Sequence, residues 1–499
     1  MWLALLLLAG FVSACSSAGA GPAIVAVAMS QPPTNLDPRI GQDAASERLA
    51  QLLFSSLVKK NGRFEIEPDL AVSWETPDAR TYVFHLRKDA VFHDGRKLTA
   101  RDVAFTFQSI LENRLPPPNP KAGTYRFIES VDAPDAHTVV FKLKEPHAPF
   151  LWNLARGGIG VVPEGSPPGF ARNPIGSGPF RFVHYVQDSE IVLARHDEYY
   201  DAKPKIARLK FKIIPEAIVR ALELRKGSVD IALNMLTPDM VETLRRDPQL
   251  EVAASPGANY QYLAFNLKDP VFSDVRVRKA IAHAIDRKAI VDHLLRGQAR
   301  LASGIIPPGH WCFEANVATY AYDPPRAHAL LREAGVAKLS FTYRTSTDET
   351  GRQTASVFQQ QLKEVGVDMQ IRSNEFATFF ADVQKGNFQA YSLQWVGGNN
   401  DPDIFNHVFH SNMIPPNGAN RGRYANPAVD RLIELTQRTS DLAERKAACQ
   451  AIQRIVAEDL PYVSLWHLDN VAVYNKRISG VELLPSGDYD FLTRITVKD

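Results

Sequence analysis

The stretch that decides the fold is YVFHLRKDAVFHDGRKLTARDVAFTF, residues 82–107, which predicts a strand, a tight turn and a capped helix in a fixed order. Tyr82 to Leu86 alternates apolar and mixed residues with the period of a half-buried strand, and the His-Asp-Gly sequence at 93–95 supplies turn residues. Thr99 precedes Asp102 by three residues, which is the spacing of a capping box at a helix start. A turn aspartate usually accepts backbone amides, so this stretch predicts structure and not catalysis.

Six further stretches, in order along the chain, carry a resemblance to a known family. They are PDLAVSWE (68–75), NPIGSGPFRFVHY (173–185), DVRVRKAIAHAIDR (274–287), LLREAGV (330–336), QQQLKEVGV (359–367) and YANPAVDRLI (424–433). Together with residues 82–107 they closely resemble the family 5 extracellular solute-binding proteins of bacterial ABC importers, the group that contains oligopeptide- and dipeptide-binding proteins. The resemblance runs from about Ala23 to the C-terminus, and it implies a receptor and not an enzyme.

The resemblance also implies a domain organisation. At 499 residues the chain exceeds what one hydrophobic core usually organises. The family has an α/β, two-lobed periplasmic-binding-protein-like fold of the large, three-domain type, with a ligand cleft and a hinge between the lobes. We expect the chain to cross between the lobes near Phe265-Asn266 and His467-Asp469, where backbone rotation can move each lobe as a body. The expected division is lobe I (domain I) at 23–45, 172–265 and 469–499, inserted domain II at 46–171, and lobe II (domain III) at 266–468.

The charge balance and the motif content argue against other classes of function. The chain has 57 basic and 55 acidic residues, a net charge of +2, and no dense basic run with interleaved aromatics, so nucleic acid is not indicated as a partner. It contains no G-x-S-x-G elbow, H-E-x-x-H sequence or P-loop, and its 13 histidines form no i, i+4 pair on a helix face. We therefore predict a monomeric protein without catalytic activity, cofactor or metal site.

The amino terminus predicts export and lipid anchoring. Residues 1–14 are apolar and uncharged but shorter than a membrane span, which suits a signal peptide, although no Lys or Arg precedes the apolar run. Val-Ser-Ala-Cys at 12–15 resembles a lipobox, which implies that Cys15 carries a diacylglyceryl group and that residues 15–22 form a flexible tether. A plain secretory signal, cleaved a few residues later, is the alternative. We expect the mature protein on the periplasmic side of the cell envelope, or on the outer face of the membrane.

The other two cysteines are Cys312 and Cys449, and the sequence leaves open whether they form one disulfide or none. Neither lies in a C-x-x-C pair, so a zinc site or a thioredoxin-like function has no support.

The expected ligand cleft is predicted from YSLQWVGGNNDPDIF at 391–405. A strand ending at Trp395 is followed by a loop whose glycines permit close approach of another backbone, so a peptide could dock through its main chain. A core position is the alternative for Trp395. The predicted ligand-binding residues of this segment are Trp395, Val396, Gly397, Gly398, Asn399, Asn400 and Asp401.

The segment departs from the family at one position. In the better-known peptide binders, an aspartate shortly after this tryptophan pairs with the α-ammonium group of the ligand. Here Gly398 stands at that position, and Asp401 and Asp403 are the nearest acids. Two glycines and two asparagines suit amides better than ammonium groups, so we expect acetylation of a peptide's amino terminus to change affinity little. A turn at Asp401-Pro402 is an equally good interpretation of Asp401.

Weaker candidates lie on other segments. Tyr260 and Tyr262 alternate with a glutamine on a strand, so one face could present phenols to a ligand, with core packing as the alternative. Arg344 lies next to the position where dipeptide-binding members carry a carboxylate-binding arginine, and a solvated surface arginine is the alternative. Arg421 and Arg423 follow a loop rich in Gly and Pro, and we expect them to add positive potential near the mouth of lobe II.

The resemblance favours a peptide or peptide-like ligand, which the receptor delivers to a membrane permease and its ATPase. Family members that bind nickel chelates, haem or opines leave a non-peptide ligand as the alternative.

Overall fold

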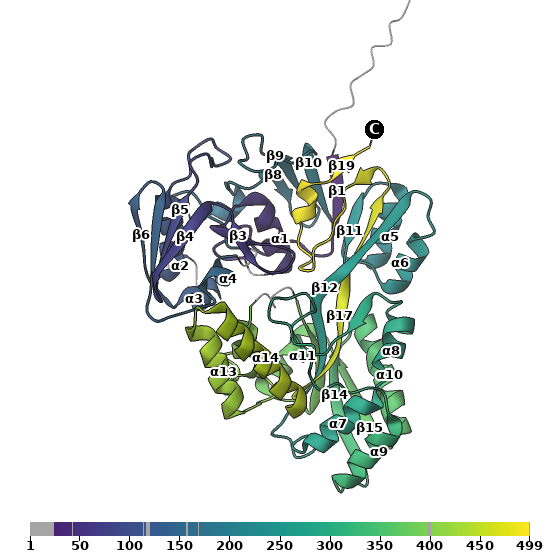
Figure 1. Cartoon of the computed structure of the whole chain (residues 1–499). Coiled ribbons are helices and arrows are strands. Elements are labelled where there is room, and N and C mark those ends of the chain that lie inside the picture. Colours follow the sequence, from purple (N-terminus) through teal and green to yellow (C-terminus); the bar gives the residue numbers. More distant parts are fainter. Residues whose placement is uncertain are drawn as a thin grey trace, which may run out of the picture.

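The computed structural model describes residues 24–41, 43–112, 114–115, 120–155, 158–167, 169–396 and 401–498. The predictions for the signal peptide, for Cys15 and its tether, and for Gly397 to Asn400 lie outside these residues. Figure 1 shows two lobes, one above the other, with the long strands β12 (Leu250–Phe265) and β17 (Tyr462–Asn475) running from one to the other. Within the described ranges, no helix is long and apolar enough to cross a membrane.

One eleven-stranded sheet passes through both lobes. Its order is β15-β14-β16-β12-β17-β11-β1-β10-β9-β8, with β13 paired to β17. The upper lobe holds β1 (Ile24–Met29), β8 (Phe180–Val186), β9 (Glu190–Arg195), β10 (Arg208–Ile213) and β11 (Ile231–Leu233). The lower lobe holds β13 (Ala299–Leu301), β14 (Leu339–Ser346), β15 (Val367–Asn374) and β16 (Ala390–Trp395).

A second, four-stranded sheet forms the left part of the upper lobe (Figure 1). Its order is β4 (Ala71–Asp78), β5 (Thr81–Leu86), β7 (Thr138–Leu143) and β6 (Ile128–Asp135). The sheet packs against α2 (Ala100–Leu111) around Phe84, Phe107 and Phe141. The capping box predicted for Thr99 and Asp102 is confirmed, and Gly95 has a positive φ of 84° in the predicted turn. The strand, turn and helix predicted for residues 82–107 are therefore confirmed.

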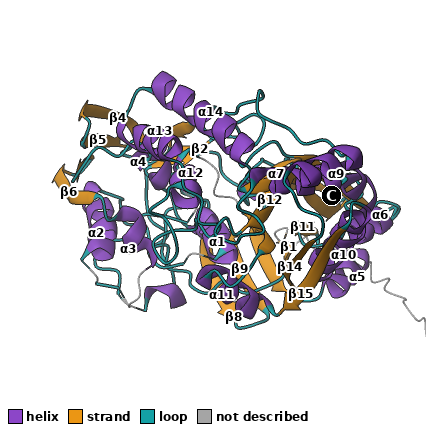
Figure 2. Ribbon diagram, turned by 90° about the horizontal axis from the view of Figure 1, so that it is seen from below, coloured by secondary structure: helices purple, strands orange, loops and turns teal. Residues whose placement is uncertain are grey.

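Figure 2 shows, from below, helices beside the strands of the large sheet, while β4, β5 and β6 lie at one edge of the molecule. The remaining helices of the upper lobe are α1 (Ala44–Leu53), α3 (Pro120–Tyr125), α4 (Phe150–Leu154), α5 (Ala217–Lys226) and α6 (Pro238–Leu244), and its short strands β2 (Val58–Lys60) and β3 (Ile66–Pro68) pair with each other. The lower lobe contains α7 (Val275–Ala284), α8 (Arg287–Ala289), α9 (Pro324–Glu333), α10 (Glu349–Glu364), α11 (Phe376–Lys385), α12 (Asp403–Phe409), α13 (Pro427–Arg438) and α14 (Leu442–Asp459).

Aspartate caps fix the starts of two helices. α1 begins at Ala44 and α10 at Glu349. In each case an aspartate, Asp43 or Asp348, accepts a backbone N–H of the first turn. After α1 the backbone becomes extended at Phe54, which ends the helix.

The lobes are joined where β12 and β17 change register. Residues 250–255 pair antiparallel with 470–475, residues 259–264 pair with 462–468, and the register shifts between Ser255 and Asn259. At this crossing a Cβ on Gly257 would lie 2.1 Å from the carbonyl oxygen of Leu468, so only glycine permits the close approach of the two backbones. The predicted boundary at residue 469 falls in this crossing, whereas the predicted boundary at 265–266 falls at the end of β12.

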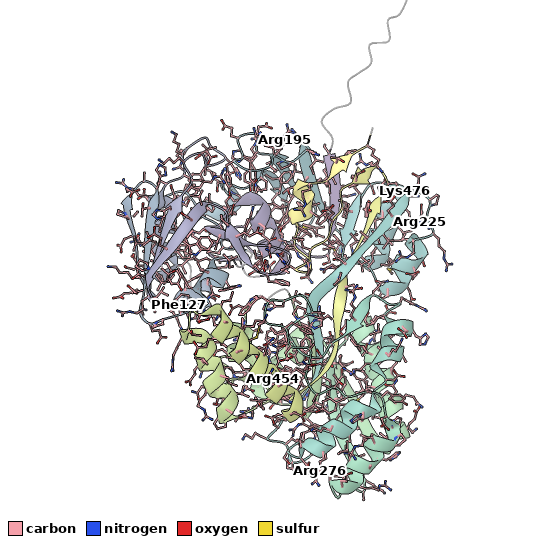
Figure 3. The ribbon with its side chains drawn as sticks, viewed as in Figure 1. Phe127, Arg195, Arg225, Arg276, Arg454 and Lys476 are labelled. Atoms are coloured by element: carbon pink, nitrogen blue, oxygen red, sulfur yellow. A yellow bond between two sulfur atoms is a disulfide. The ribbon has the colours of Figure 1, made fainter. Side chains whose placement is uncertain are left out.

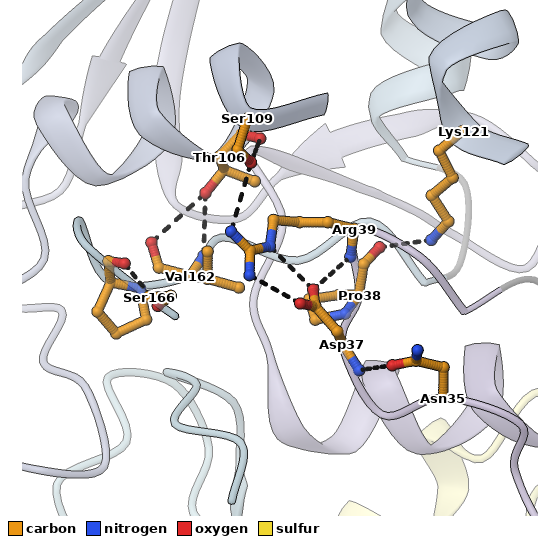
Figure 4. A network of polar contacts seen from close by, with 10 residues as sticks. Asn35, Asp37, Pro38, Arg39, Thr106, Ser109, Lys121, Val162 and Ser166 are labelled. Atoms are coloured by element: carbon orange, nitrogen blue, oxygen red, sulfur yellow. Dashed lines mark hydrogen bonds and ion pairs between the residues drawn. The ribbon is translucent and has the colours of Figure 1, made fainter. Parts of the chain in front are cut away.

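A buried ion pair fixes the loop that follows β1 to the helices of the four-stranded sheet (Figure 4). The Arg39 guanidinium donates to both carboxylate oxygens of Asp37 at 2.9 and 2.7 Å, and its Nη1 lies 3.4 Å from the Ser109 hydroxyl of α2. The ammonium group of Lys121 in α3 donates to the Pro38 carbonyl at 2.5 Å. Because Asp37 and Arg39 are each 1% exposed, pairing is needed to offset the desolvation of both charges.

Two histidines pack together where the turn at 93–95 meets the Gly-Ser-Gly sequence at 176–178. The backbone N–H of Gly176 donates to His93 Nδ1 at 3.1 Å, so the proton of the neutral ring lies on Nε2, which donates to the Gly178 carbonyl at 3.2 Å. The His196 ring lies 4.9 Å away, centroid to centroid. Burial lowers the pKa of His93 to about 3, because a charged ring would be desolvated and would lose its acceptor for Gly176.

The lowered pKa of His93 predicts a loss of stability in acid. An unfolded histidine binds a proton below about pH 6.5, whereas folded His93 stays neutral, so unfolding is favoured as the pH falls from 6.5 toward 3. Between pH 7 and pH 5 we expect His93 to account for about 1–2 kcal/mol of the lost unfolding free energy. Urea denaturation at both pH values should show a smaller loss in His93→Gln than in the wild type. The matched control is His184→Gln on the exposed side of β8, and an equal loss in all three proteins would contradict the prediction.

Candidate functional site

An aromatic cluster occupies the lower lobe where β12, β16 and β17 run side by side. Tyr262 of β12 stacks on Tyr462 of β17 with ring centroids 4.2 Å apart, and on Trp395 of β16 at 6.4 Å, both with an interplanar angle of 15°. Tyr260 stacks on Tyr262 at 5.7 Å, and its hydroxyl lies 2.7 Å from that of Ser464. Burial raises the pKa of each of these tyrosines, so the phenols are neutral.

The two predicted tyrosines therefore take core positions in this structure. Tyr260 is 2% exposed and Tyr262 is fully buried, which is the alternative that the sequence left open. Trp395 is half-buried at the end of β16, and Val396, which follows it, is 53% exposed. The Trp395 indole N–H is buried and has no hydrogen-bond partner among the described residues. Of the predicted aromatic residues, Trp395 is thus the one that lies at the edge of the cluster.

Arg421 covers the same cluster from a neighbouring loop. Its guanidinium lies over the Trp395 ring at 5.3 Å and over the Phe380 ring of α11 at 5.2 Å. It donates from Nε to the Gln384 side-chain oxygen at 3.1 Å, and from Nη1 toward the Tyr262 hydroxyl at 3.4 Å. The predicted positive charge at this loop is therefore present, but it lies largely buried among aromatic rings.

Arg344 has a different environment. Its Nη1 donates to the Asp382 carboxylate at 2.7 Å, and the two side chains are 12% and 28% exposed. Arg344 is therefore not a solvated surface arginine. Its guanidinium is also not unpaired, because it already has an acidic partner within the lower lobe. A ligand carboxylate would have to compete with Asp382 for it.

Asp401, the nearest acid to the missing aspartate, is also paired. Its two carboxylate oxygens accept from Arg445 Nη2 of α14, both at 2.9 Å, and one of them also accepts the backbone N–H of Asp403. Arg445 is 1% exposed and Asp401 is 7% exposed. Burial raises the pKa of Asp401, while the charge of Arg445 opposes that shift. Asp401 therefore holds an arginine of the protein, as well as forming the turn that the sequence suggested.

The Arg445 guanidinium connects the two lobes. It lies 4.9 Å from the ring of Trp152, on α4 of the upper lobe, and 5.6 Å from the ring of Trp311 in the lower lobe. The backbone N–H of Ala148 donates across the same junction to the Gln437 carbonyl of α13 at 2.7 Å. Figure 3 labels Phe127 at the edge of the upper lobe that faces α13, where its ring stacks on His147 at 3.9 Å. The two lobes are therefore in contact at a place distant from the β12–β17 crossing.

Sequence reasoning missed this junction. Trp152, Trp311 and Arg445 lie far apart along the chain and in none of the motifs quoted above, so nothing local indicates that they meet. The sequence also left the cysteines undecided. In the structure Cys312 and Cys449 form a buried disulfide that ties the segment beside Trp311 to α14. No group of three or more His, Cys, Asp or Glu side chains able to hold a metal ion occurs within the described ranges.

The pairing of Asp401 with Arg445 predicts a large effect of a small substitution. Asp401→Asn keeps the shape of the side chain but leaves a buried guanidinium without its counter-charge, so we expect the unfolding free energy to fall by about 3–5 kcal/mol. The matched control is Glu458→Gln, which breaks the surface pair with Lys279 and should cost about 1 kcal/mol or less. Chemical denaturation measures both unfolding free energies. A similar small loss in the two variants would show that the buried pair contributes no more to stability than the surface pair does.

Comparison with known proteins supports this architecture. Residues 65–414 match the family described as bacterial extracellular solute-binding proteins, family 5 Middle. The dipeptide-binding protein of Escherichia coli strain K12 is 30% identical over 471 residues, which cover 88% of each chain. Heme-binding protein A of Haemophilus influenzae is 30% identical over 482 residues, 90% of this chain and 87% of the relative. The structure of DppA from Helicobacter pylori in complex with the peptide STSA has a TM-score of 0.80 at 27% identity, covering 96% of this chain and 98% of that chain.

Proposed function

The chain belongs to the bacterial extracellular solute-binding proteins, family 5, and from this premise we propose that it captures peptides or peptide-like solutes between its lobes and delivers them to an ABC importer. The observation that carries the proposal is the relationship over 88% of the chain to a dipeptide-binding protein, at 30% identity. Two lobes joined by two crossing strands are also what a receptor that closes around a solute requires.

The ligand is proposed to contact the loop that follows β16, largely through main-chain groups of Val396 to Asn400 and with Trp395 beside it. Backbone hydrogen bonds tolerate any side chain, which suits a receptor for varied peptides. Because Asp401 is held by Arg445, recognition of a free α-ammonium group would cost the protein a buried ion pair. We therefore propose that the amino terminus of the ligand is not read by a carboxylate in this loop.

A non-peptide ligand is the second candidate. It is favoured by the relationship to heme-binding protein A, which is as close in identity as that to the dipeptide-binding protein. The absence of an acid at position 398 also removes one contact that peptide binders of the family make. The described residues contain no metal-binding cluster, so the protein itself would contact the organic part of a haem or metal chelate.

The boundaries of lobe I, inserted domain II and lobe II given above remain a proposal. It is supported by separate hydrophobic cores among the described residues: one lies around the four-stranded sheet, two lie on β1 and its neighbours in the upper lobe, and two more lie in the lower lobe. We further propose that a permease and an ATPase are the partners, that the receptor acts as a monomer, and that it does not catalyse a reaction.

The peptide proposal predicts the outcome of a thermal-shift screen. The panel contains di- to tetrapeptides, their N-acetylated counterparts, haemin, and nickel with histidine. Peptides should raise the melting temperature, because a ligand that binds the folded state at a hundred times its Kd adds about 2.7 kcal/mol of stability. Acetylated and free peptides should have similar affinities in titration calorimetry. Stabilisation by haemin or the nickel complex, with no response to any peptide, would overturn the proposal in favour of the second candidate.

The proposed anchor at Cys15 predicts covalent lipid attachment. Cells given a radiolabelled fatty acid should label the wild-type protein and not Cys15→Ser, because the thiol is the site to which the diacylglyceryl group is attached. The same cells should release Cys15→Ser from the membrane fraction, since several buried acyl chains are what makes anchoring stable. The matched control is Ser16→Ala. Equal labelling of wild type and Cys15→Ser would show that the protein is secreted without a lipid.

A further inference from the structure

We propose that Arg296 and the pocket around it limit how far the two lobes open, so that this contact sets the affinity of the receptor for its solute. The pocket lies between the lobes, on the side of the β12–β17 crossing opposite the junction of Trp152, Arg445 and Trp311. The inference adds a conformational device to the proposed capture function, and it rests on that function only for the effect on affinity.

A pocket of about 510 Å³ separates the two lobes on this side. Its upper wall is formed by α6 and the residues that follow it, and its lower wall by the π-helical turn Ile290–Leu294, which continues α8, together with Arg296. We call this space the hinge-side pocket. Its lining residues are Asp239, Glu242, Thr243, Arg246, Asp292 and Arg296.

The hinge-side pocket lies directly beside the crossing of β12 and β17. The Gln298 side-chain amide donates to the Pro238 carbonyl of α6 at 3.3 Å, and the Gln298 carbonyl accepts the backbone N–H of Asp469 at 3.0 Å. Figure 1 shows α6 and α8 to the right of the two strands, and α4, α13 and α14 to the left. Figure 2, from below, also separates α6 from α4 and α13. The pocket and the junction therefore lie on opposite sides of the crossing.

A rotation about the crossing moves these two sides in opposite directions. When the lobes separate at the junction, α6 must approach the lower lobe on the other side. In this structure the junction is formed, with the rings of Trp152 and Trp311 6.0 Å apart, and the hinge-side pocket is open. The pocket is therefore the space that opening of the cleft side consumes, and the side chains in it set where the movement ends.

Arg296 is the side chain that spans this space. Its Nε donates to the Asp239 carboxylate of the upper lobe at 2.8 Å, and the two side chains are 49% and 73% exposed. An exposed ion pair adds little to the stability of a folded chain. Between two lobes that move, however, the same small free energy acts directly on the ratio of open to closed forms.

The backbone at Arg296 indicates that its side chain has a role. Arg296 has a φ of 52°, in the left-handed region that favours glycine, and Gly297 after it has a φ of 73°. The Gly297 N–H donates to the Val291 carbonyl at 2.9 Å, so the turn itself needs only backbone groups. An arginine kept where glycine would be free of strain is explained by the contact that its side chain makes.

The chemistry of the pocket also opposes its collapse. Every lining residue except Thr243 carries a charge. Charged side chains are strongly hydrated, and removing water from them is costly. Opening therefore ends against a hydrated, charged surface before the two walls touch.

The test fills the pocket in one variant and empties it in another. Thr243→Trp adds bulk at an exposed position of α6, and Arg296→Gly removes the spanning side chain while relieving the backbone strain. Leu222→Trp, at a 54% exposed position of α5 outside the pocket, is the matched control for bulk. Asp188→Gly, at another exposed residue with a positive φ of 55°, is the matched control for strain.

The first measurement needs no ligand. Spin labels are attached to Lys144→Cys of the upper lobe and Arg438→Cys of α13, both exposed, and pulsed electron resonance gives the distance between them across the junction. Cys312 and Cys449 form a disulfide and do not take the label. Relative to the labelled wild type, Thr243→Trp should shift the population toward short distances and Arg296→Gly toward long ones. The two control variants should match the wild type.

The second measurement is titration calorimetry with trialanine. If the closed form is a minor population without ligand, Thr243→Trp should bind about tenfold more tightly, because less of the binding free energy is used to close the lobes. Arg296→Gly should bind about two- to fivefold more weakly. Leu222→Trp and Asp188→Gly should bind trialanine as the wild type does.

The distances decide the inference independently of the peptide. The wild type cannot be both fully open and fully closed, so at least one of Thr243→Trp and Arg296→Gly must shift its distances. Unchanged distances in both, or a shift of Thr243→Trp toward long distances, would overturn the inference and leave peptide capture intact. Expected distance shifts without any binding of trialanine would support the limit on opening and count against peptide capture. If Thr243→Trp does not fold, as judged by circular dichroism, Thr243→Phe takes its place.

Discussion

The antiparallel pairing of β12 with β17 is the constraint on which the rest of the molecule depends. Each strand contributes one half to the sheet of the upper lobe and the other half to that of the lower lobe. At the crossing, Gly257 lies against the Leu468 carbonyl, and Asn470 is buried with hydrogen bonds to Asn234 and to the carbonyls of 484 and 485. The backbones are thus tightly packed where the lobes join, while the ladder is interrupted there. An interrupted ladder between two continuous ones is where rotation of one lobe against the other disturbs the fewest hydrogen bonds.

The sequence predicted what local patterns encode. The strand and capped helix of residues 82–107 have signals that lie within a few residues of one another, because turn chemistry, capping and periodicity are local properties. The caps Asp43 and Asp348 are less apparent, because an aspartate before an irregular apolar pattern is easily assigned to the preceding loop. The order of the sheet could not be predicted from local patterns, since β1 lies between β10 and β11, which come some 180 and 200 residues later.

For the candidate site, too, the sequence predicted some features and could not predict others. The sequence identified Trp395, Asp401 and Arg421 as residues near the site, because they lie in or beside loops rich in glycine, proline and asparagine. It could not predict their partners. Asp401 pairs with Arg445, which lies 44 residues later in the sequence, and Tyr262 contacts Arg421, which lies 159 residues later. Whether a charged side chain is available to a ligand depends on such partners, and this is a property of tertiary packing. Arg344 is an example, since its guanidinium is paired with the carboxylate of Asp382, 38 residues later in the sequence.

The junction formed by Trp152, Arg445 and Trp311 bears on how the lobes close. A hinged receptor is in equilibrium between open and closed forms, and a change from 1:99 to 99:1 requires about 5.5 kcal/mol of differential binding. The contacts between the lobes at this junction are a backbone hydrogen bond, a guanidinium over an aromatic ring, and aromatic pairs such as Trp152 with Trp311 and Phe64 with His310. Each of these groups can be hydrated when the lobes separate, so each contributes about 1 kcal/mol or less to closure. The junction therefore holds the lobes together through contacts that are individually weak. The differential contacts of a bound solute with the two lobes then decide which form prevails.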